Sequence, residues 1–158
     1  MSIRIGNGFD IHRLIAGREL ILGGVHIPYE RGLEGFSDAD VLTHAIIDSL
    51  LGAAGLGDIG TWFPAGSPQY AGAQSTYLLQ MVNDMLEERS YRIINIDSTV
   101  LCEEPILAPY ISAMKKALSN VLEVDEALLN IKASTMEKLG EIGRGEAIAA
   151  MAGALIEV

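Results

Sequence analysis

The chain has 158 residues, and 49% of them are hydrophobic, which is enough for one domain with a sizeable core and too much for a disordered chain. Its formal net charge is −10, with 11 basic residues against 21 acidic ones, and this balance excludes nucleic-acid binding through general electrostatics. An acidic protein can still bind a phosphate ligand if metal ions or a few placed cations supply local positive charge.

Cysteine content and hydropathy bear on where the protein works. Cys102 is the only cysteine, so no intrachain disulfide can form and a reducing compartment fits. The first residues lack the basic and apolar blocks of a signal peptide, and the longest apolar stretch, 148–156, is too short to span a bilayer. We therefore expect no membrane partner, and a cytoplasmic location or a plastid one after removal of a transit segment.

The first third of the chain predicts two strands and a helix. Apolar residues alternate over residues 3–11, which predicts a strand with one buried face. A second strand is expected over 19–28, followed by a loop over 29–36. Residues 37–40 resemble a capping box, and 41–56 continue at helical spacing.

The rest of the sequence also predicts helices alternating with strands. We expect a loop over 64–72, a helix over 75–89 capped by Ser75, a strand over 91–103 that stops before Pro105, a helix over 110–122 and a strand over 129–133. The tail from Glu146 fits either a helix or a buried strand, because its small residues hide the periodicity. Without any linker-like segment, residues 1–158 predict one domain with helices covering one face of a sheet.

Asp10 and His12 form the first group of residues that could bind a metal ion. Side chains two apart on a strand point to the same face, so both can aim at one point. Together with His44 they would form an Asp, His, His set, a common catalytic zinc arrangement with one coordination position open. The alternative is a strand end with one carboxylate and one ordinary hydrogen-bonded histidine.

Asp40, His44 and Asp48 lie four residues apart, so they share one face of the predicted helix. A carboxylate one turn from a metal-bound histidine can orient its ring by accepting the second N–H. Either Asp40 or Asp48 could do so, and the alternative is a solvated acidic face.

The segment 132–144 mixes hydroxyls, a carboxylate and cations, which suits phosphate oxygens and Mg²⁺. The alternative is an ordinary polar loop. Cys102 is interpreted as a small buried residue rather than a nucleophile, and His26 as a surface or packing residue.

Four ordered motifs resemble one known family. They are RIGNGFDIHR, SDADVLTHA, GLGDIG followed by Phe63-Pro64, and the late KASTMEKLG block with GRGE. Together they resemble the 2-C-methyl-D-erythritol 2,4-cyclodiphosphate synthases of non-mevalonate isoprenoid biosynthesis, over essentially the whole chain. The resemblance implies an α+β fold with a mixed sheet packed against helices on one face, assembled as a homotrimer with active sites between subunits.

The resemblance also implies a reaction. The 2-phosphate of 4-diphosphocytidyl-2-C-methyl-D-erythritol 2-phosphate attacks the β-phosphate, CMP leaves, and a cyclic diphosphate remains, which makes the enzyme a metal-dependent phosphorus–oxygen lyase. By resemblance, Asp10, His12 and His44 hold Zn²⁺, and Glu137 holds a second divalent cation, Mg²⁺ or Mn²⁺. Thr135 steadies the transferring phosphoryl group, while Arg144 and Glu146 lie near the trimer axis.

The substrate contacts implied by the resemblance fall into three segments. They comprise Asp10, His12, Phe36, Ser37, Asp58, Ile59, Gly60 and Phe63 in the first half of the chain, then Cys102, Glu103, Glu104, Pro105, Ile106, Leu107 and Ala108, and finally Ser134, Thr135, Met136, Glu137, Glu141 and Arg144. The middle segment corresponds to the loop whose backbone reads cytosine.

Several positions depart from the family pattern. Phe36 stands where a catalytic histidine is usual, and 65–67 read Ala-Gly-Ser where Asp-Thr-Asp is usual. Ile106 replaces a common lysine, and Glu141 replaces a common phenylalanine. Three alternatives to the synthase follow: a weakened paralogue that binds zinc and cytidine nucleotide, a prenyl diphosphate binding module, and a metal-dependent phosphohydrolase.

Overall fold

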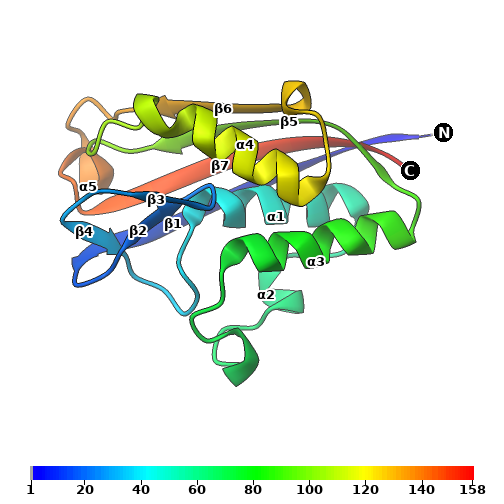
Figure 1. The fold of residues 1–158 in the computed structure, drawn as a ribbon, viewed down its shortest axis with the longest axis horizontal. Coiled ribbons are helices and arrows are strands. Elements are labelled where there is room, and N and C mark those ends of the chain that lie inside the picture. Colours follow the sequence, from blue (N-terminus) through cyan, green and yellow to red (C-terminus); the bar gives the residue numbers. More distant parts are fainter. Residues whose placement is uncertain (1) are drawn as a thin grey trace.

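The computed structural model describes residues 2–158 and contains a five-stranded mixed sheet with the order β4-β1-β7-β5-β6 (Figure 1). Only the β5–β6 pair is parallel; the other neighbouring pairs are antiparallel. The strands are β1 (Ile3–Ala16), β4 (Arg31–Leu33), β5 (Arg92–Leu101), β6 (Leu129–Ser134) and β7 (Ala147–Glu157), and a separate hairpin joins β2 (Leu20–Leu22) to β3 (Val25–Ile27). The predicted α+β class with a mixed sheet is confirmed.

Three long helices lie on one face of this sheet, as predicted (Figure 1). They are α1 (Val41–Ala54), α3 (Ser75–Glu88) and α4 (Ile111–Leu122). Helix α1 contacts β1 and β7, α4 contacts β6, and α3 packs against both α1 and α4. Two four-residue helices, α2 (Ile59–Trp62) and α5 (Gly140–Gly143), were not predicted because they are too short to show a helical period.

Helix α1 lies directly on β1 because two glycines leave room for its backbone. A Cβ atom at Gly6 would lie 1.9 Å from the carbonyl oxygen of Ser49, and one at Gly8 would lie 1.9 Å from that of Ala45. Neither distance is sterically allowed for a larger residue. Gly6 and Gly8 share their strand face with Asp10, so this close contact also sets how near α1 comes to Asp10.

The opposite face of β1 carries its apolar side chains. Ile5 is 76% exposed and Phe9 is 55% exposed, and Met151 of β7, the register partner of Phe9, is 48% exposed. The predicted strand is confirmed, but its buried face is the glycine face rather than the apolar one. The alternation of apolar residues therefore marks an uncovered surface of the single chain.

Several predicted boundaries were wrong for local reasons. The expected strand over 19–28 is a hairpin, because Gly23 and Gly24 adopt positive φ angles of 57° and 72° and turn the chain back. The expected loop over 29–36 contains β4. Asp40 rather than Ser37 caps α1, by accepting a hydrogen bond from the Thr43 N–H at 3.0 Å.

The second half agrees more closely with the predicted elements. Ser75 is the first residue of α3, and Gln74 stands at the N-cap position. The Ser75 hydroxyl instead donates to Asp38 in the 37–40 segment. The ambiguous tail is β7, a central strand whose alanines pack under α1. Among residues 2–158, no helix has the length and apolar character needed to cross a membrane.

Candidate metal centre and neighbouring pockets

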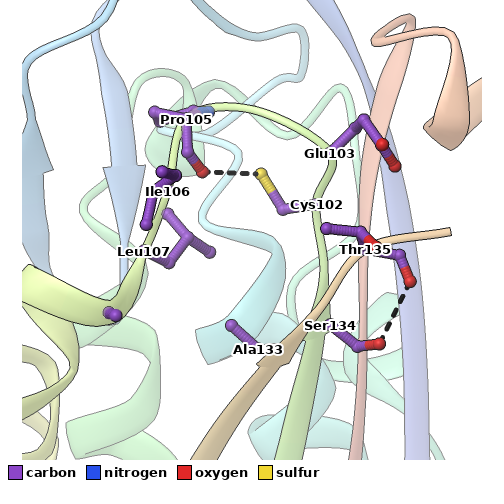
Figure 2. A pocket seen from close by; sticks show the side chains of 9 residues that line it. Cys102, Glu103, Pro105, Ile106, Leu107, Ala133, Ser134 and Thr135 are labelled. Carbon is purple, nitrogen blue, oxygen red and sulfur yellow. Dashed lines mark hydrogen bonds between the residues drawn. The ribbon is translucent and has the colours of Figure 1, made fainter. Parts of the chain in front are cut away.

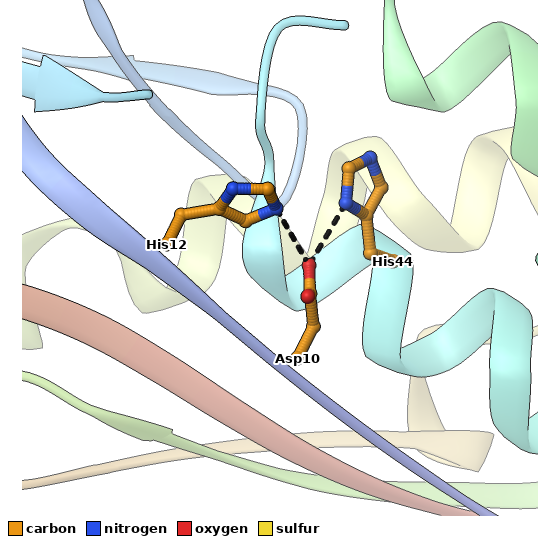
Figure 3. A group of neighbouring side chains, drawn as sticks. All are labelled: Asp10, His12 and His44. Atoms are coloured by element: carbon orange, nitrogen blue, oxygen red, sulfur yellow. Dashed lines mark hydrogen bonds and ion pairs between the residues drawn. The ribbon is translucent and has the colours of Figure 1, made fainter. Parts of the chain in front are cut away.

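Asp10, His12 and His44 meet at one point between β1 and α1 (Figure 3). The Asp10 Oδ2 atom lies 2.9 Å from His12 Nε2 and 2.9 Å from His44 Nδ1. One ligand atom from each residue lies within 4.8 Å of the other two. The predicted convergence of these three side chains is confirmed, although His44 comes from a different element, 34 residues away from Asp10.

The hydrogen bonds of His12 determine which of its ring nitrogens faces Asp10 and His44. Its Nδ1 lies 2.6 Å from the backbone carbonyl of Glu34, which can only accept, so Nδ1 carries the proton. When the ring is protonated, Nε2 donates to the Asp10 carboxylate, and loss of that proton leaves an Nε2 lone pair directed at the same point. Two imidazole nitrogens and one carboxylate oxygen fit Zn²⁺ and leave a coordination position open.

Charge in the cluster favours an ionised carboxylate. Burial raises the pKa of Asp10, but hydrogen bonds and charge interactions with His12 and His44 outweigh it and lower the pKa to about 2. Burial lowers the pKa of His12, yet its hydrogen bond to Asp10 raises it above the ordinary value. The Asp10 carboxylate is therefore anionic throughout the physiological range.

The two helix carboxylates proposed to orient His44 do something else. The buried Asp40 accepts from the N–H groups of Gly23 and Gly24 at 2.9 and 2.7 Å and caps α1. Asp48 accepts from the Ile59 N–H at 2.7 Å and so attaches α2 to α1. The prediction that one of them holds the His44 ring was wrong, because both point to backbone N–H groups.

A cavity of about 250 Å³ opens beside Asp10, His12 and His44, and its lining is mostly apolar. Its lining includes the predicted residues Phe36, Ser37, Ile59, Gly60 and Phe63, and it adds Ala65, Tyr70 and Leu78. Asp58 caps α2 by accepting from the Thr61 N–H at 2.9 Å, immediately before Ile59. Of the predicted contacts in the first half of the chain, all but Asp58 line this cavity.

A second cavity, of about 180 Å³, lies where β5 and β6 end (Figure 2). It is lined by Cys102, Glu103, Pro105, Ile106, Leu107, Ala108, Ala133, Ser134 and Thr135, which are mostly residues of the predicted cytosine loop and the late motif. The two cavities share no lining residue, so the predicted site is divided between two places in one chain.

Cys102 fits its prediction as an inert buried residue. Its thiol donates to the Glu104 carbonyl at 3.2 Å, and burial raises its pKa to about 12, helped by the charges of Glu103 and Glu104. His26 of β3 is exposed, also as predicted.

The residues of the late motif that follow Thr135 are spread over a turn and a third cavity. Glu137 is exposed, with a left-handed φ of 51°, just past β6. Arg144 lines a third cavity of about 380 Å³ together with Lys138. Its guanidinium pairs with Glu146 at 2.8 Å and with Glu141 at 3.7 Å, so neighbouring carboxylates balance its charge.

Comparison with known proteins places these features in a family. A sequence model of the YgbB family matches residues 3–157. The chain belongs to the YgbB family. It is 56% identical over 156 residues to the 2-C-methyl-D-erythritol 2,4-cyclodiphosphate synthase of Nostoc sp., covering 99% of this chain and 94% of the relative. It is 54% identical over 155 residues to the synthase of Dehalococcoides mccartyi, covering 98% and 99%.

Solved structures give the same family fold. The bifunctional IspDF of Campylobacter jejuni matches with a TM-score of 0.94 at 41% identity, over 98% of this chain and 42% of that one. IspF of Plasmodium falciparum, solved as a CDP complex, matches with a TM-score of 0.86 at 36% identity, over 98% and 96%. The YgbB fold thus extends over nearly the whole of this chain.

Sequence reasoning missed the groups that orient the two histidines. The Glu34 carbonyl binds His12, and the Ser75 hydroxyl lies 2.8 Å from His44 Nε2. A backbone carbonyl leaves no sequence signal, and Ser75 is 31 residues from His44. The only available signal was the polar Ser75 at the start of an amphipathic helix, and it was interpreted as a cap.

Proposed function

We propose that this chain catalyses the cyclisation of 4-diphosphocytidyl-2-C-methyl-D-erythritol 2-phosphate to 2-C-methyl-D-erythritol 2,4-cyclodiphosphate, with release of CMP. The observation that carries the proposal is the meeting of Asp10, His12 and His44 beside a cavity in a chain 54–57% identical to synthases over nearly its full length. That level of identity favours the synthase over the paralogue, the prenyl diphosphate module and the phosphohydrolase.

Asp10, His12 and His44 would hold Zn²⁺, since their donor atoms and charge fit that ion. When bound there, the ion supplies Lewis acidity toward a phosphoryl oxygen of the substrate. Glu137 would hold a second divalent cation, Mg²⁺ or Mn²⁺. Its exposed carboxylate is a hard oxygen ligand, and the remaining ligands would be phosphate oxygens and water.

The protein side chains act mainly by positioning, because the substrate supplies its own nucleophile. The cavity formed by residues 102–108 and 133–135 would take the cytidine end, with Thr135 next to the diphosphate. The apolar cavity by the zinc ligands would take the methylerythritol part. Holding the two phosphates of one molecule in line is worth effective molarities of roughly 10⁵ M or more.

Phe36 limits this chemistry. Its ring is 41% exposed and lines the cavity beside His12, where it offers no hydrogen bond to a phosphate. Loss of one such donor costs about 3 kcal/mol of transition-state stabilisation, which is a hundredfold or more in rate. We therefore propose a slow synthase rather than an inactive one.

We further propose that the active chain is a homotrimer with sites between subunits. Two observations support this. The two predicted halves of the site lie in separate cavities of one chain, and the uncovered sheet face presents Ile3, Ile5, Phe9, Ile11 and Met151. A contiguous apolar surface of this kind is typical of a protein interface. The single, reduced cysteine fits a reaction in the cytoplasm or a plastid.

Phosphorus NMR tests the proposed reaction directly. The cytidyl diphosphate substrate is incubated with the chain, Zn²⁺ and Mg²⁺, and the expected products are the cyclic diphosphate and CMP. His44→Ala is the matched control and should form neither, because two remaining ligands rarely retain zinc. Tight substrate binding without product would move the function to the paralogue, and linear hydrolysis products would move it to the phosphohydrolase.

A further inference from the structure

A buried serine connects His44 to a second carboxylate. Ser75 is fully buried at the start of α3, and its Oγ lies 2.8 Å from His44 Nε2. The Ser75 hydroxyl also forms a short hydrogen bond to Asp38 Oδ1, and the Ser75 N–H donates to Asp38 Oδ2 at 3.0 Å. The chain Asp38, Ser75, His44, Asp10 thus joins the 37–40 loop to the metal cluster through α3.

The direction of these hydrogen bonds follows from which groups can donate. The Asp38 carboxylate only accepts, so the one hydroxyl proton of Ser75 points at Asp38. The Ser75 oxygen must then accept from His44, which places the ring proton of His44 on Nε2. The second oxygen near Nε2 is Ser37 Oγ at 3.2 Å; it accepts from the Ala39 N–H and has a second lone pair that can accept from Nε2.

The tautomer matters because it decides which nitrogen is free to bind metal. A proton on Nε2 leaves the Nδ1 lone pair pointing at the cluster, 2.9 Å from Asp10 Oδ2. A proton on Nδ1 would leave Nε2 facing Ser75 and would remove His44 as a ligand. We propose that Asp38 and Ser75 are positioning residues that hold His44 in its metal-binding tautomer, and this inference rests on the metal site of the proposed function.

Removal of the Ser75 hydroxyl tests this role through metal affinity. Ser75→Ala should lower the Zn²⁺ affinity of the apoprotein 10- to 100-fold, the usual cost of losing a partner of a ligating histidine. Competition with a chromophoric chelator measures it without any substrate. Ser49→Ala is the control: Ser49 is equally buried on the same helix as His44, but its hydroxyl donates to the Ile46 carbonyl at 2.7 Å. Its zinc affinity should stay unchanged.

Asp38→Asn provides a second variant that keeps the side-chain size. The amide would donate to the Ser75 oxygen, which frees the hydroxyl proton to point at His44 and favours the wrong tautomer. Zinc affinity should therefore fall at least as far as in Ser75→Ala. Circular dichroism establishes that each variant remains folded.

The metal-free wild type gives a readout that a purely structural role would not change, because bound zinc would itself fix the tautomer. A two-bond ¹⁵N–¹H correlation spectrum should show the His44 ring proton on Nε2, and in Ser75→Ala that proton should exchange faster with water. A proton on Nδ1 in the wild type, or wild-type zinc affinity in both variants, overturns the inference. If Ser75→Ala does not fold, the wild-type spectrum and Asp38→Asn decide. None of these measurements depends on the cyclisation reaction, so they can be interpreted even if the chain does not catalyse the proposed reaction.

Discussion

Gly8→Ala should separate α1 from β1 and open the metal site. The new Cβ would lie 1.9 Å from the Ala45 carbonyl oxygen, about 1.5 Å short of ordinary van der Waals contact. The obstacle is helix backbone on one side and strand backbone on the other, so α1 must move away by about that amount. Overpacking of this kind costs roughly 3 kcal/mol or more of the free energy of unfolding.

His44 is the residue before Ala45, so it moves with the displaced helix. Its Nδ1, now 2.9 Å from Asp10 Oδ2, would shift by more than a metal site tolerates, since ligand distances must hold within about 0.2 Å. We expect the zinc affinity of Gly8→Ala to fall at least about 100-fold. Its melting temperature should fall by roughly 6–12 °C for a domain of this size.

Thermal unfolding and zinc competition measure these two effects, and Gly52→Ala is the matched control. Gly52 lies on α1 and also faces β1, but its Cβ would meet nothing nearer than 3.8 Å. That variant should gain about 0.5–1 kcal/mol through helix propensity and keep its zinc affinity. If Gly8→Ala melts and binds zinc like the wild type, the glycine contact does not set the position of α1.

Three further predictions concern the active site, the thiol and the assembly. Phe36→His should raise the cyclisation rate about a hundredfold by restoring a donor beside the phosphates, and Phe36→Leu should leave the slow rate unchanged in the phosphorus NMR assay. The pKa of Cys102 is raised from 9.0 to about 12, so its thiol should be alkylated at least about 100-fold more slowly than an ordinary thiol at pH 8. The contribution of the protonated thiol to the stability of the fold is complete below pH 9 and lost as the pH rises toward 12. Equal reactivity in folded and urea-unfolded protein would contradict this. Ile5→Glu should convert the proposed trimer to monomer in sedimentation velocity. Arg92→Glu should not; the Arg92 side chain is also exposed, and within residues 2–158 it forms an ion pair with Glu157.

The parts of the site that follow from strand period were predictable. Asp10 and His12 are two apart, so they share a strand face whatever the rest of the chain does. The place of His44 could not be derived in this way, because it depends on two glycines letting α1 approach β1. Residue type and the family resemblance pointed to His44, and the close approach of α1 to β1 explains how its side chain reaches Asp10.

The errors at Ser75 and Asp40 and the ambiguity at β7 share one physical cause. Ser75 and Asp40 were assigned from local patterns, and each makes a tertiary contact that overrides the pattern. The alanine-rich β7 shows no clear period because it packs tightly between two strands and under α1, where only small side chains fit. Patterns among residues within ten positions of one another cannot report contacts between residues 17 or more positions apart.

Strand β1 carries two surfaces in strict alternation. Phe9 and Ile11 face outward from the sheet, while Asp10 and His12 point to the metal cluster under α1. In the proposed homotrimer a neighbouring subunit would cover Phe9 and Ile11, and Phe9 is one peptide bond from Asp10. Contact between subunits on the outer face and the arrangement of Asp10 and His12 on the inner face would therefore share one strand backbone, so that assembly helps to fix the site.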